Sequence, residues 1–570
     1  MSFKRKHQKA KPFTPSIFDT AELGRTVPDE VYRREVPALR TRLLEAQFAL
    51  SQADFPVILL FAGVDKAGKR ELSNLLSAWM DTRLLVTRAF SPIPEKERRH
   101  PRYWRYWQAM PPKGRMGILL SAWYSRPLLD RVFRGHSREE FDEHLENIAA
   151  LERTLVDDGA LLIKCWMHLG KDEQKERLET LEADPLQEWR VAKSDWKNWK
   201  KYDDFAAAGE QLITRTSTGQ APWTIIEGMD ANYRSLMVGA LVCERIERHV
   251  SERARERELA KVSSDLPPLL SLNGVLPSFA DEESSEASDP VTILSTLDMD
   301  SRMKKKTYHR KLRALQARLA ILHRQAKAEG IPMALVFEGW DAAGKGGAIR
   351  RLTQALDARD YEVLPVAAPT DEESAQHYLW RFWRQIPEKG RVTIFDRSWY
   401  GRVLVERVEG FASEAEWRRA YRELNEFERQ LADFGMVVLK FWIHITKDEQ
   451  GARFEARKDT PFKTWKLTEE DWRNREKWDA YSQAVHEMVQ LTSTAAAPWT
   501  LVEGDDKRHA RVRVLETVCD ALEARLDSPP KSLLARLKGD GRQVAAADDP
   551  EDELDRDFGD PEDEAHTDDD

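Results

Sequence analysis

Residues 337–349 read FEGWDAAGKGGAI, a stretch whose residue types suit phosphate binding. Gly339, Gly344 and Lys345 have the spacing of a phosphate loop, and the stretch lies between an expected strand and an expected helix. Small residues there let backbone N–H groups converge on phosphate oxygens, while the helix N-terminus and the lysine supply positive charge. The alternative is a tight glycine turn with a solvent-facing lysine, which the strand–loop–helix setting disfavours.

The residue after the loop lysine departs from the usual pattern. A Ser or Thr normally stands there and ligates Mg²⁺, but this chain has Gly346, followed by Gly347. Asp341, inside the loop, offers a hard carboxylate oxygen of the kind that magnesium prefers. Asp396 ends an apolar run in VTIFDRSWYGR (392–402), as a Walker B carboxylate does, although it could also be a strand-end cap. Because the carboxyl ends of parallel strands meet at one sheet edge, we predict that Asp341 and Asp396 hold one Mg²⁺.

A third group of residues that suits phosphate chemistry is cationic. Arg453 and Arg457 lie four residues apart in ARFEARKDTPFKTWK (452–466), so on a helix they face the same way. A closing segment with such cations would exclude water and stabilise a phosphoryl-transfer transition state. A solvated basic helix face is the alternative.

The elements that must position these residues occur twice in the chain. Gly63 in FAGVDKAGK matches Gly339, an offset of 276 residues, and the same offset relates APWTIIEG (221–228) to APWTLVEG (497–504). Such a constant offset indicates a duplication. We therefore predict two homologous domains, residues 32–250 and 308–526.

Within each domain, short apolar runs alternate with helical stretches. In the second, MALVFEG (333–339), RVTIFD (391–396) and WTLVEG (499–504) are expected strands, and GGAIRRLTQAL (346–356) is an expected helix. Continuous apolar strands separated by helices are typical of a parallel sheet covered on both faces. The predicted fold class is α/β, a three-layer αβα sandwich in tandem.

Three segments flank the two domains. Residues 1–31 form a basic N-terminal extension, 251–307 a linker and approach helix, and 527–570 a C-terminal extension. The last part, 548–570, has fourteen acidic side chains and one arginine, so we expect it to be disordered. The whole chain has a net charge of −9 and this tail contributes −13, so the remainder carries +4.

The composition indicates a cytoplasmic protein. The 570 residues are 33% charged and 41% apolar, and no run reaches the ~18 apolar residues of a membrane helix. The basic N-terminus leads into no apolar core, so no secretory signal is expected. Three scattered cysteines argue against disulfides and zinc. The basic clusters KRKHQK (4–9) and MKKKTYHRK (303–311) accompany no recognition module, so neither a nucleic acid nor a membrane is an expected partner.

Four segments together resemble the polyphosphate kinase 2 family: GWDAAGKGG, FDRSWYGRVLVERV, WRFWRQIPEKG and DTPFKTWK. The resemblance implies a P-loop kinase fold with helical lids that moves phosphate between inorganic polyphosphate and nucleotides. The tandem arrangement is similar to the two-domain class, polyphosphate:AMP phosphotransferases, which make ADP from AMP. The implied partners are thus a polyphosphate donor and AMP or another nucleotide as acceptor, with Mg²⁺ as cofactor.

The resemblance also implies roles for single residues. The loop glycines and Lys345 would bind phosphate, Asp341 and Asp396 would hold the metal, and Arg397 would neutralise charge during transfer. The basic lid would comprise Arg453, Arg457 and Lys466. Three residues after the strand-end pair are expected near the nucleotide: Trp399, Tyr400 and Arg402.

The first repeat departs from this pattern. Gly346 and Gly347 become Arg70 and Glu71, which are expected to crowd the loop. The other catalytic positions change as well: Asp396 to Leu120, Arg397 to Ser121, Arg457 to Leu181 and Lys463 to Gln187. Loss of a metal ligand and of charge compensation predicts a catalytically degenerate domain with a structural or polyphosphate-holding role.

Other functions stay open. Transfer to ADP or other nucleoside diphosphates, or an ordinary ATP-dependent nucleotide kinase, would use the same loop. A polyphosphate-binding protein without turnover is conceivable because the first repeat is degenerate. A homo-oligomer is compatible with the sequence but not specified by it.

Overall fold

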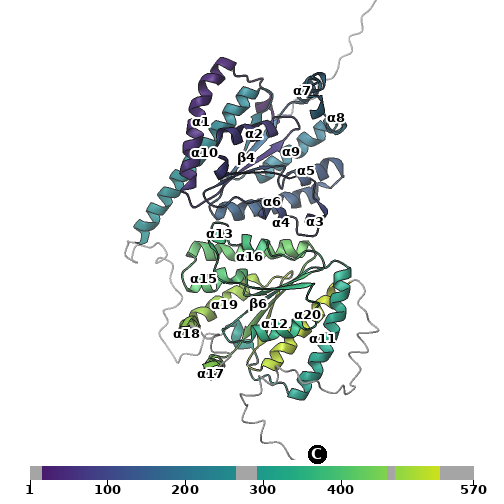
Figure 1. Ribbon diagram of the computed structural model, residues 1–570, viewed down its shortest axis with the longest axis vertical. Helices are drawn as coiled ribbons and strands as arrows, with labels where there is room; N and C mark the ends of the chain where they lie inside the picture. Colours follow the sequence, from purple (N-terminus) through teal and green to yellow (C-terminus); the bar gives the residue numbers. More distant parts are fainter. Residues whose placement is uncertain (1–15, 91, 265–291, 459–468, 527–570) are drawn as a thin grey trace, which may run out of the picture. The chain divides into compact units, whose positions relative to one another are not determined.

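The computed structural model describes residues 16–90, 92–264, 292–458 and 469–526, and the chain forms two compact units. The first comprises Met1–Arg98, Tyr103–Glu286 and Pro369–Arg384, and the second Arg99–Arg102, Ala287–Ala368 and Gln385–Asp570. Each unit contains one sheet with helices on both faces (Figure 1). The first fifteen residues, the acidic tail and Lys466 lie outside the described residues.

The sheet of the first unit is parallel, with five strands in the order β2-β3-β1-β4-β5. β1 is central, so the loop that follows it lies at the middle of the carboxyl edge. The strands are β1 (Val57–Gly63), β2 (Leu85–Ala89), β3 (Met116–Leu120), β4 (Leu161–His168) and β5 (Trp223–Glu227).

The second unit repeats this sheet, and its order β7-β8-β6-β9-β10 corresponds strand for strand. β8, β9 and β10 arise from apolar runs, whereas β7 is an edge strand with mostly exposed side chains, which hydrophobicity alone does not mark. The strands are β6 (Met333–Gly339), β7 (Tyr361–Pro365), β8 (Val392–Asp396), β9 (Val437–His444) and β10 (Trp499–Glu503).

Helices cover both faces of the first sheet. α10 packs on β4 and β5 with α1 against it, and α6 packs on β4 with α5 and α9 against it. The helices that lie before β4 in the chain are α1 (Asp29–Ser51), α2 (Lys69–Trp79), α3 (Glu95–Arg98), α4 (Trp104–Trp107), α5 (Ser125–Phe133) and α6 (Arg138–Asp157). Those after β4 are α7 (Lys171–Ala183), α8 (Lys193–Trp199), α9 (Tyr202–Thr216) and α10 (Ala231–Ser264).

The second sheet is covered in the same way. α20 packs on β9 and β10 with α11 and α12 against it, and α16 packs on β9 with α15 and α19 against it. The helices of the second half of the chain, of which α13 and α14 belong to the first compact unit, are α11 (Lys305–Ala328), α12 (Lys345–Thr353), α13 (Asp371–Ser374), α14 (Trp380–Trp383), α15 (Val405–Val408), α16 (Glu414–Asp433), α17 (Lys447–Lys458), α18 (Glu469–Glu476), α19 (Trp478–Thr492) and α20 (Lys507–Arg525). The 3₁₀ turns that bear on the site are η3 (Glu188–Arg190) and η7 (Trp399–Val403).

The predicted fold class is confirmed, because two parallel sheets with helices on both faces recur in tandem. The strands at the sheet centre are buried, β1 along its whole length and β6 up to its last residue, which explains their mostly apolar sequences. All three cysteines are buried and free. Among the described helices, none is long and apolar enough to cross a bilayer.

Candidate active site

The phosphate loop of the second repeat joins the end of β6 to the start of α12. Gly339 and Gly344 have φ values of 149° and 104°, which side chains rarely adopt. A Cβ atom at Gly339 would also lie 2.4 Å from the carbonyl oxygen of Ile443, so only glycine fits there. α12 begins at Lys345, directly after Gly344, so its unpaired N-terminal amides belong to the loop.

Lys345 is the cation at the centre of this loop. Its ammonium donates to the carbonyl oxygens of Gly339 at 2.7 Å and Trp340 at 3.2 Å. Burial lowers the pKa of Lys345, and nearby carboxylates oppose this shift. The carboxylates that act on it are those of Asp341, Asp396 and Glu338.

Asp341 is the buried anion of the loop. Its Oδ1 accepts a hydrogen bond from Arg397 at 2.9 Å, and its Oδ2 accepts one from Asn474 at 3.0 Å. Burial alone would raise the pKa of Asp341, but Lys345, Arg397 and the bond from Asn474 lower it below its usual value. The carboxylate is therefore ionised and tied directly to the arginine of the strand-end pair.

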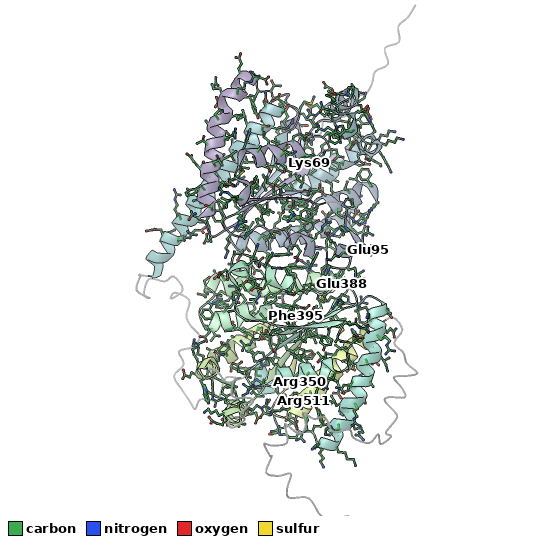
Figure 2. The ribbon with its side chains drawn as sticks, in the orientation of Figure 1. Lys69, Glu95, Arg350, Glu388, Phe395 and Arg511 are labelled. Atoms are coloured by element: carbon green, nitrogen blue, oxygen red, sulfur yellow. The ribbon has the colours of Figure 1, made fainter. Side chains whose placement is uncertain are left out.

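Asp396 and Arg397 stand where β8 ends. Asp396 pairs in register with Phe337 of β6, and its carbonyl accepts from Val366 N at 3.0 Å. Arg397 is left-handed, with φ of 65°, and its N–H donates to Phe337 O at 3.0 Å. Phe395, labelled in Figure 2, lies on β8 directly before the pair. The turn thus directs the Arg397 side chain to Asp341.

The residues of this edge fit a magnesium ion. Within the described residues, no group of three or more His, Cys, Asp or Glu side chains forms a metal site. Magnesium usually takes only one or two protein carboxylates and completes its shell with water and substrate phosphates. Asp341 and Asp396 are two such carboxylates, and both lie at the carboxyl edge of the second sheet. That they share one ion stays a prediction.

Arg453 corrects one expectation. It lies on α17 as predicted, but its side chain is buried and bonds backbone carbonyls instead of being an open cation on a closing segment. Its Nε also contacts Glu449 at 2.5 Å. The acceptors, at 2.7 to 3.0 Å, are the carbonyl oxygens of Ala342, Ala343, Gly504 and Asp505. The guanidinium therefore fixes the phosphate loop to the turn after β10.

The rest of the basic lid is described in part. Arg457 is half-buried in the last turn of α17, one helical turn beyond Arg453. Its role in transfer stays a prediction. Lys466 belongs to the residues outside the description.

Trp399 and Tyr400 correct a second expectation, because both are core residues. They are 1% and 0% exposed, and each donates to Oε1 of Glu428, at 2.9 Å from Trp399 Nε1 and 2.7 Å from Tyr400 Oη. Lys440 donates to both Glu428 and Tyr400 at 2.7 Å. Such buried side chains do not reach a nucleotide. Arg402 is half-buried and paired with Glu406 at 3.2 Å, and its nucleotide contact stays a prediction.

Sequence reasoning missed several residues around the loop. Trp340 stacks on Trp478 with ring centroids 3.7 Å apart, and its Nε1 donates to His444 at 3.0 Å. His444 is thus a half-buried residue with a hydrogen-bond partner, and burial lowers its pKa to about 4. Asn474 and Glu338 were also missed. Asn474 had a signal, since the 276-residue offset pairs it with Asn198.

The first repeat has the same loop with other partners. Lys69, labelled in Figure 2, donates to the carbonyls of Gly63 and Val64, and Asp65 accepts from Asn198 at 3.1 Å. A cavity of about 120 Å³ lies beside it, lined mainly by apolar side chains such as Leu128, Leu129, Phe133 and Phe205.

One of the two loop substitutions of the first repeat, Glu71, is paired with a residue that lies far along the chain. Glu71 forms an ion pair with Arg190, and Lys66 contacts Asp195 at 3.0 Å. A Cβ atom at Gly346 would meet open space, so Arg70 needs no displacement at the corresponding position. The two ion pairs, Lys66–Asp195 and Glu71–Arg190, form a latch between the loop and the segment 188–199, and the expected crowding of the loop by Arg70 and Glu71 stays a prediction.

The comparisons with known proteins cover both repeats. Residues 26–254 and 302–529 match the family model described as Polyphosphate kinase 2. Polyphosphate:AMP phosphotransferases of Pseudomonas syringae pv. tomato and Pseudomonas aeruginosa are each 48% identical over 89% of this chain and over 98% and 99% of their own lengths. A crystal structure of a Pseudomonas aeruginosa chain assigned to polyphosphate kinase 2 has a TM-score of 0.78 and 45% identity, and covers 89% of this chain and 99% of its own.

The match extends along both repeats and includes the phosphate loop, the strand-end pair and helix α17 of the second repeat. The chain therefore belongs to the polyphosphate kinase 2 family.

Proposed function

We propose that this protein transfers a phosphate from inorganic polyphosphate to AMP, giving ADP, with the chemistry in the second repeat. The observation that carries the proposal is the cluster of Lys345, Asp341 and Arg397 beside Asp396 at the carboxyl edge of the second sheet. Likeness along almost the whole chain to polyphosphate:AMP phosphotransferases supports AMP as the acceptor.

The reaction needs positioning and charge more than covalent chemistry. The terminal P–O–P link of polyphosphate breaks and a new link forms to a phosphate oxygen of AMP, so the donor shortens by one phosphate. Lys345 and the amides of the loop would bind the phosphate oxygens, exchanging the two carbonyl acceptors that Lys345 has here. Arg397 would place its positive charge against the transferring group.

Asp341 and Asp396 would hold Mg²⁺ in this site. The ion would supply positive charge against the phosphate oxygens during transfer. Asn474 and Arg397 already orient the Asp341 carboxylate, so binding requires little rearrangement of that side chain. The buried free thiols support a reducing compartment, in line with a cytoplasmic location.

The first repeat would not turn over substrate. Leu120 and Ser121 stand in place of the strand-end pair, which removes a metal ligand and a cation. In its latch, Lys66 and Glu71 of the loop region are already paired with Asp195 and Arg190. This supports a structural role for the copy.

A product assay tests the proposal. The purified chain is incubated with Mg²⁺, one donor (polyphosphate or ATP) and one acceptor (AMP or ADP), and nucleotides are separated by anion-exchange chromatography. We expect ADP from AMP and polyphosphate, and no product when EDTA is added. ATP formed from ADP at a higher kcat/KM would instead identify a diphosphate kinase. Product formed with ATP as the donor but not with polyphosphate would identify an ordinary nucleotide kinase. Binding of polyphosphate without any product would identify a polyphosphate-holding protein.

A further inference from the structure

A carboxylate that the proposed mechanism does not use lies inside the second sheet. Glu338 is the residue before Gly339 on β6, is 5% exposed, and pairs in register with Trp442 of β9. A charged side chain in such a position is costly unless it is paired. Its presence on a central strand therefore calls for a partner.

The partner is Ser398, which directly follows Arg397. Its hydroxyl donates to Oε1 of Glu338 at 2.8 Å and accepts from the N–H of Tyr400 at 3.3 Å. Ser398 is 3% exposed. The last backbone bond between β6 and β8 joins Arg397 N to Phe337 O, so the side-chain bond adds a rung one residue further on.

This side-chain rung connects the two segments that the chemistry needs together. Glu338 leads into the phosphate loop, and Ser398 leaves the strand-end pair Asp396–Arg397. The backbone of Arg397 has the left-handed conformation, with φ of 65°, so the regular backbone hydrogen bonds between β6 and β8 stop at this point. The rung fixes the two chain segments where the backbone no longer does.

The first repeat lacks both members of the rung. Ala62 and Ala122 stand at the positions of Glu338 and Ser398. The turn itself persists there, since Ser121 has φ of 54°. Glu152 accepts from Trp123 at 3.0 Å and from Tyr124, as Glu428 does in the second repeat. The fold of the turn thus depends on that second network, and the rung accompanies the strand-end pair.

The geometry points to Glu338 as a positioning residue, which acts through Ser398 to hold the Asp396–Arg397 pair in place against the phosphate loop. This inference rests on the proposed function of the second repeat. Small displacements of such a pair are expensive, because phosphoryl transfer depends on the placement of charge.

The decisive variant carries Glu338→Ala and Ser398→Ala together, which installs the residues that the first repeat uses. Removal of both side chains leaves neither member of the rung unpaired and costs only the weak 3.3 Å bond from the N–H of Tyr400, so the melting temperature is expected to fall only slightly below that of the parent chain. We expect kcat for ADP formation to fall about 10- to 100-fold, with a smaller change in the KM for AMP.

Single variants and a rescue sharpen this test. If the two side chains act as one rung, the double variant loses no more activity than the worse single variant, whereas independent roles would multiply the losses. Ser398→Thr keeps the hydroxyl and is expected to retain most of the activity. Ser413→Ala is the matched control, because it removes a hydroxyl bonded to a carboxylate, Glu416, at 2.7 Å at the exposed start of α16.

Three outcomes would overturn the inference: parental kcat in the double variant, multiplied losses, or a double variant that no longer folds by circular dichroism. The last would show that the rung serves folding instead of placement. Failure of the proposed function is distinguished from these, because the parent chain itself would then form no ADP.

Discussion

The loop aspartates of the two repeats, Asp341 and Asp65, occupy equivalent positions with different partners. Each accepts a hydrogen bond from an asparagine side chain, Asp341 from Asn474 of α18 and Asp65 from Asn198 of α8. Asp341 also accepts a hydrogen bond from Arg397, whereas the first repeat has Ser121 at the position of Arg397. The asparagine contact is therefore common to both loops, and the arginine contact is specific to the second repeat.

A second contrast concerns the arginine that donates to the carbonyl groups of the turn after the last strand of each sheet. In the second repeat it is Arg453 of α17, which bonds the carbonyls of Gly504 and Asp505. In the first repeat Arg234 of α10 bonds the equivalent carbonyls, those of Gly228 and Met229, at 2.8 and 3.3 Å. Its Nε lies 2.4 Å from the position that a Cβ of Gly68 would occupy.

The bonds to the turn after the last strand are thus retained, while the arginine that donates them changes. Arg177, the counterpart of Arg453, donates to the Met229 carbonyl at 3.4 Å. The position of Arg234 is Ala510 in the second repeat. A requirement of the fold is met by different residues in the two copies, whereas the strand-end pair has no substitute among the described residues of the first.

The sharpest way to break this comparison is to change Asp396, the strand-end carboxylate that we propose holds the metal. Asp396→Asn keeps the shape of the side chain but removes its charge, so kcat should fall about 1000-fold or more. Asp65→Asn in the first repeat should change kcat little. Equal losses in the product assay would mean that both repeats catalyse.

Replacing the cation of the pair should have the next largest effect. Arg397→Ser installs the residue of the first repeat and removes the partner of Asp341, so kcat should fall about 100- to 1000-fold. The reverse change, Ser121→Arg, should give no turnover when Asp396 is also Asn, since Leu120 supplies no carboxylate. ADP formation by that combined variant would contradict the assignment of a silent first repeat.

The buried networks should respond alike in the two repeats. Glu428→Gln and Glu152→Gln each leave a fully buried lysine, Lys440 or Lys164, without its carboxylate. Each should lower the free energy of unfolding of its repeat by about 3 kcal/mol, measured by urea denaturation. A large loss from only one of the two would show that the networks are not equivalent.

The smallest effect concerns acid stability. His444 has a folded pKa of about 4 because of burial, so between that value and its ordinary one the unfolded chain binds more protons. Lowering the pH from 7 to 5 should therefore cost about 1–2 kcal/mol at this site, a loss that His444→Gln removes. His168→Gln should alter the pH dependence less, because Glu22, 2.7 Å from the ring, favours the protonated form of His168.

Local spacing predicted the parts of the site that lie close in the chain. Gly339, Gly344 and Lys345 formed the expected loop, because strand, turn and helix follow one another within a few residues. The apolar run before Asp396 predicted a strand, and β8 ends at that residue. Side-chain direction was less predictable. Trp399 and Tyr400 lie next to the pair in sequence but point to Glu428 of α16.

The sequence by itself determined the duplication, the α/β class, the loop and the loss of the strand-end pair from the first copy, because each depends on residue identity and spacing. Only the tertiary structure decided that Arg453 clamps carbonyls and that Glu338 pairs with Ser398. A side chain of known position has many neighbours within reach, and the packing of elements distant in the chain selects which of them it meets.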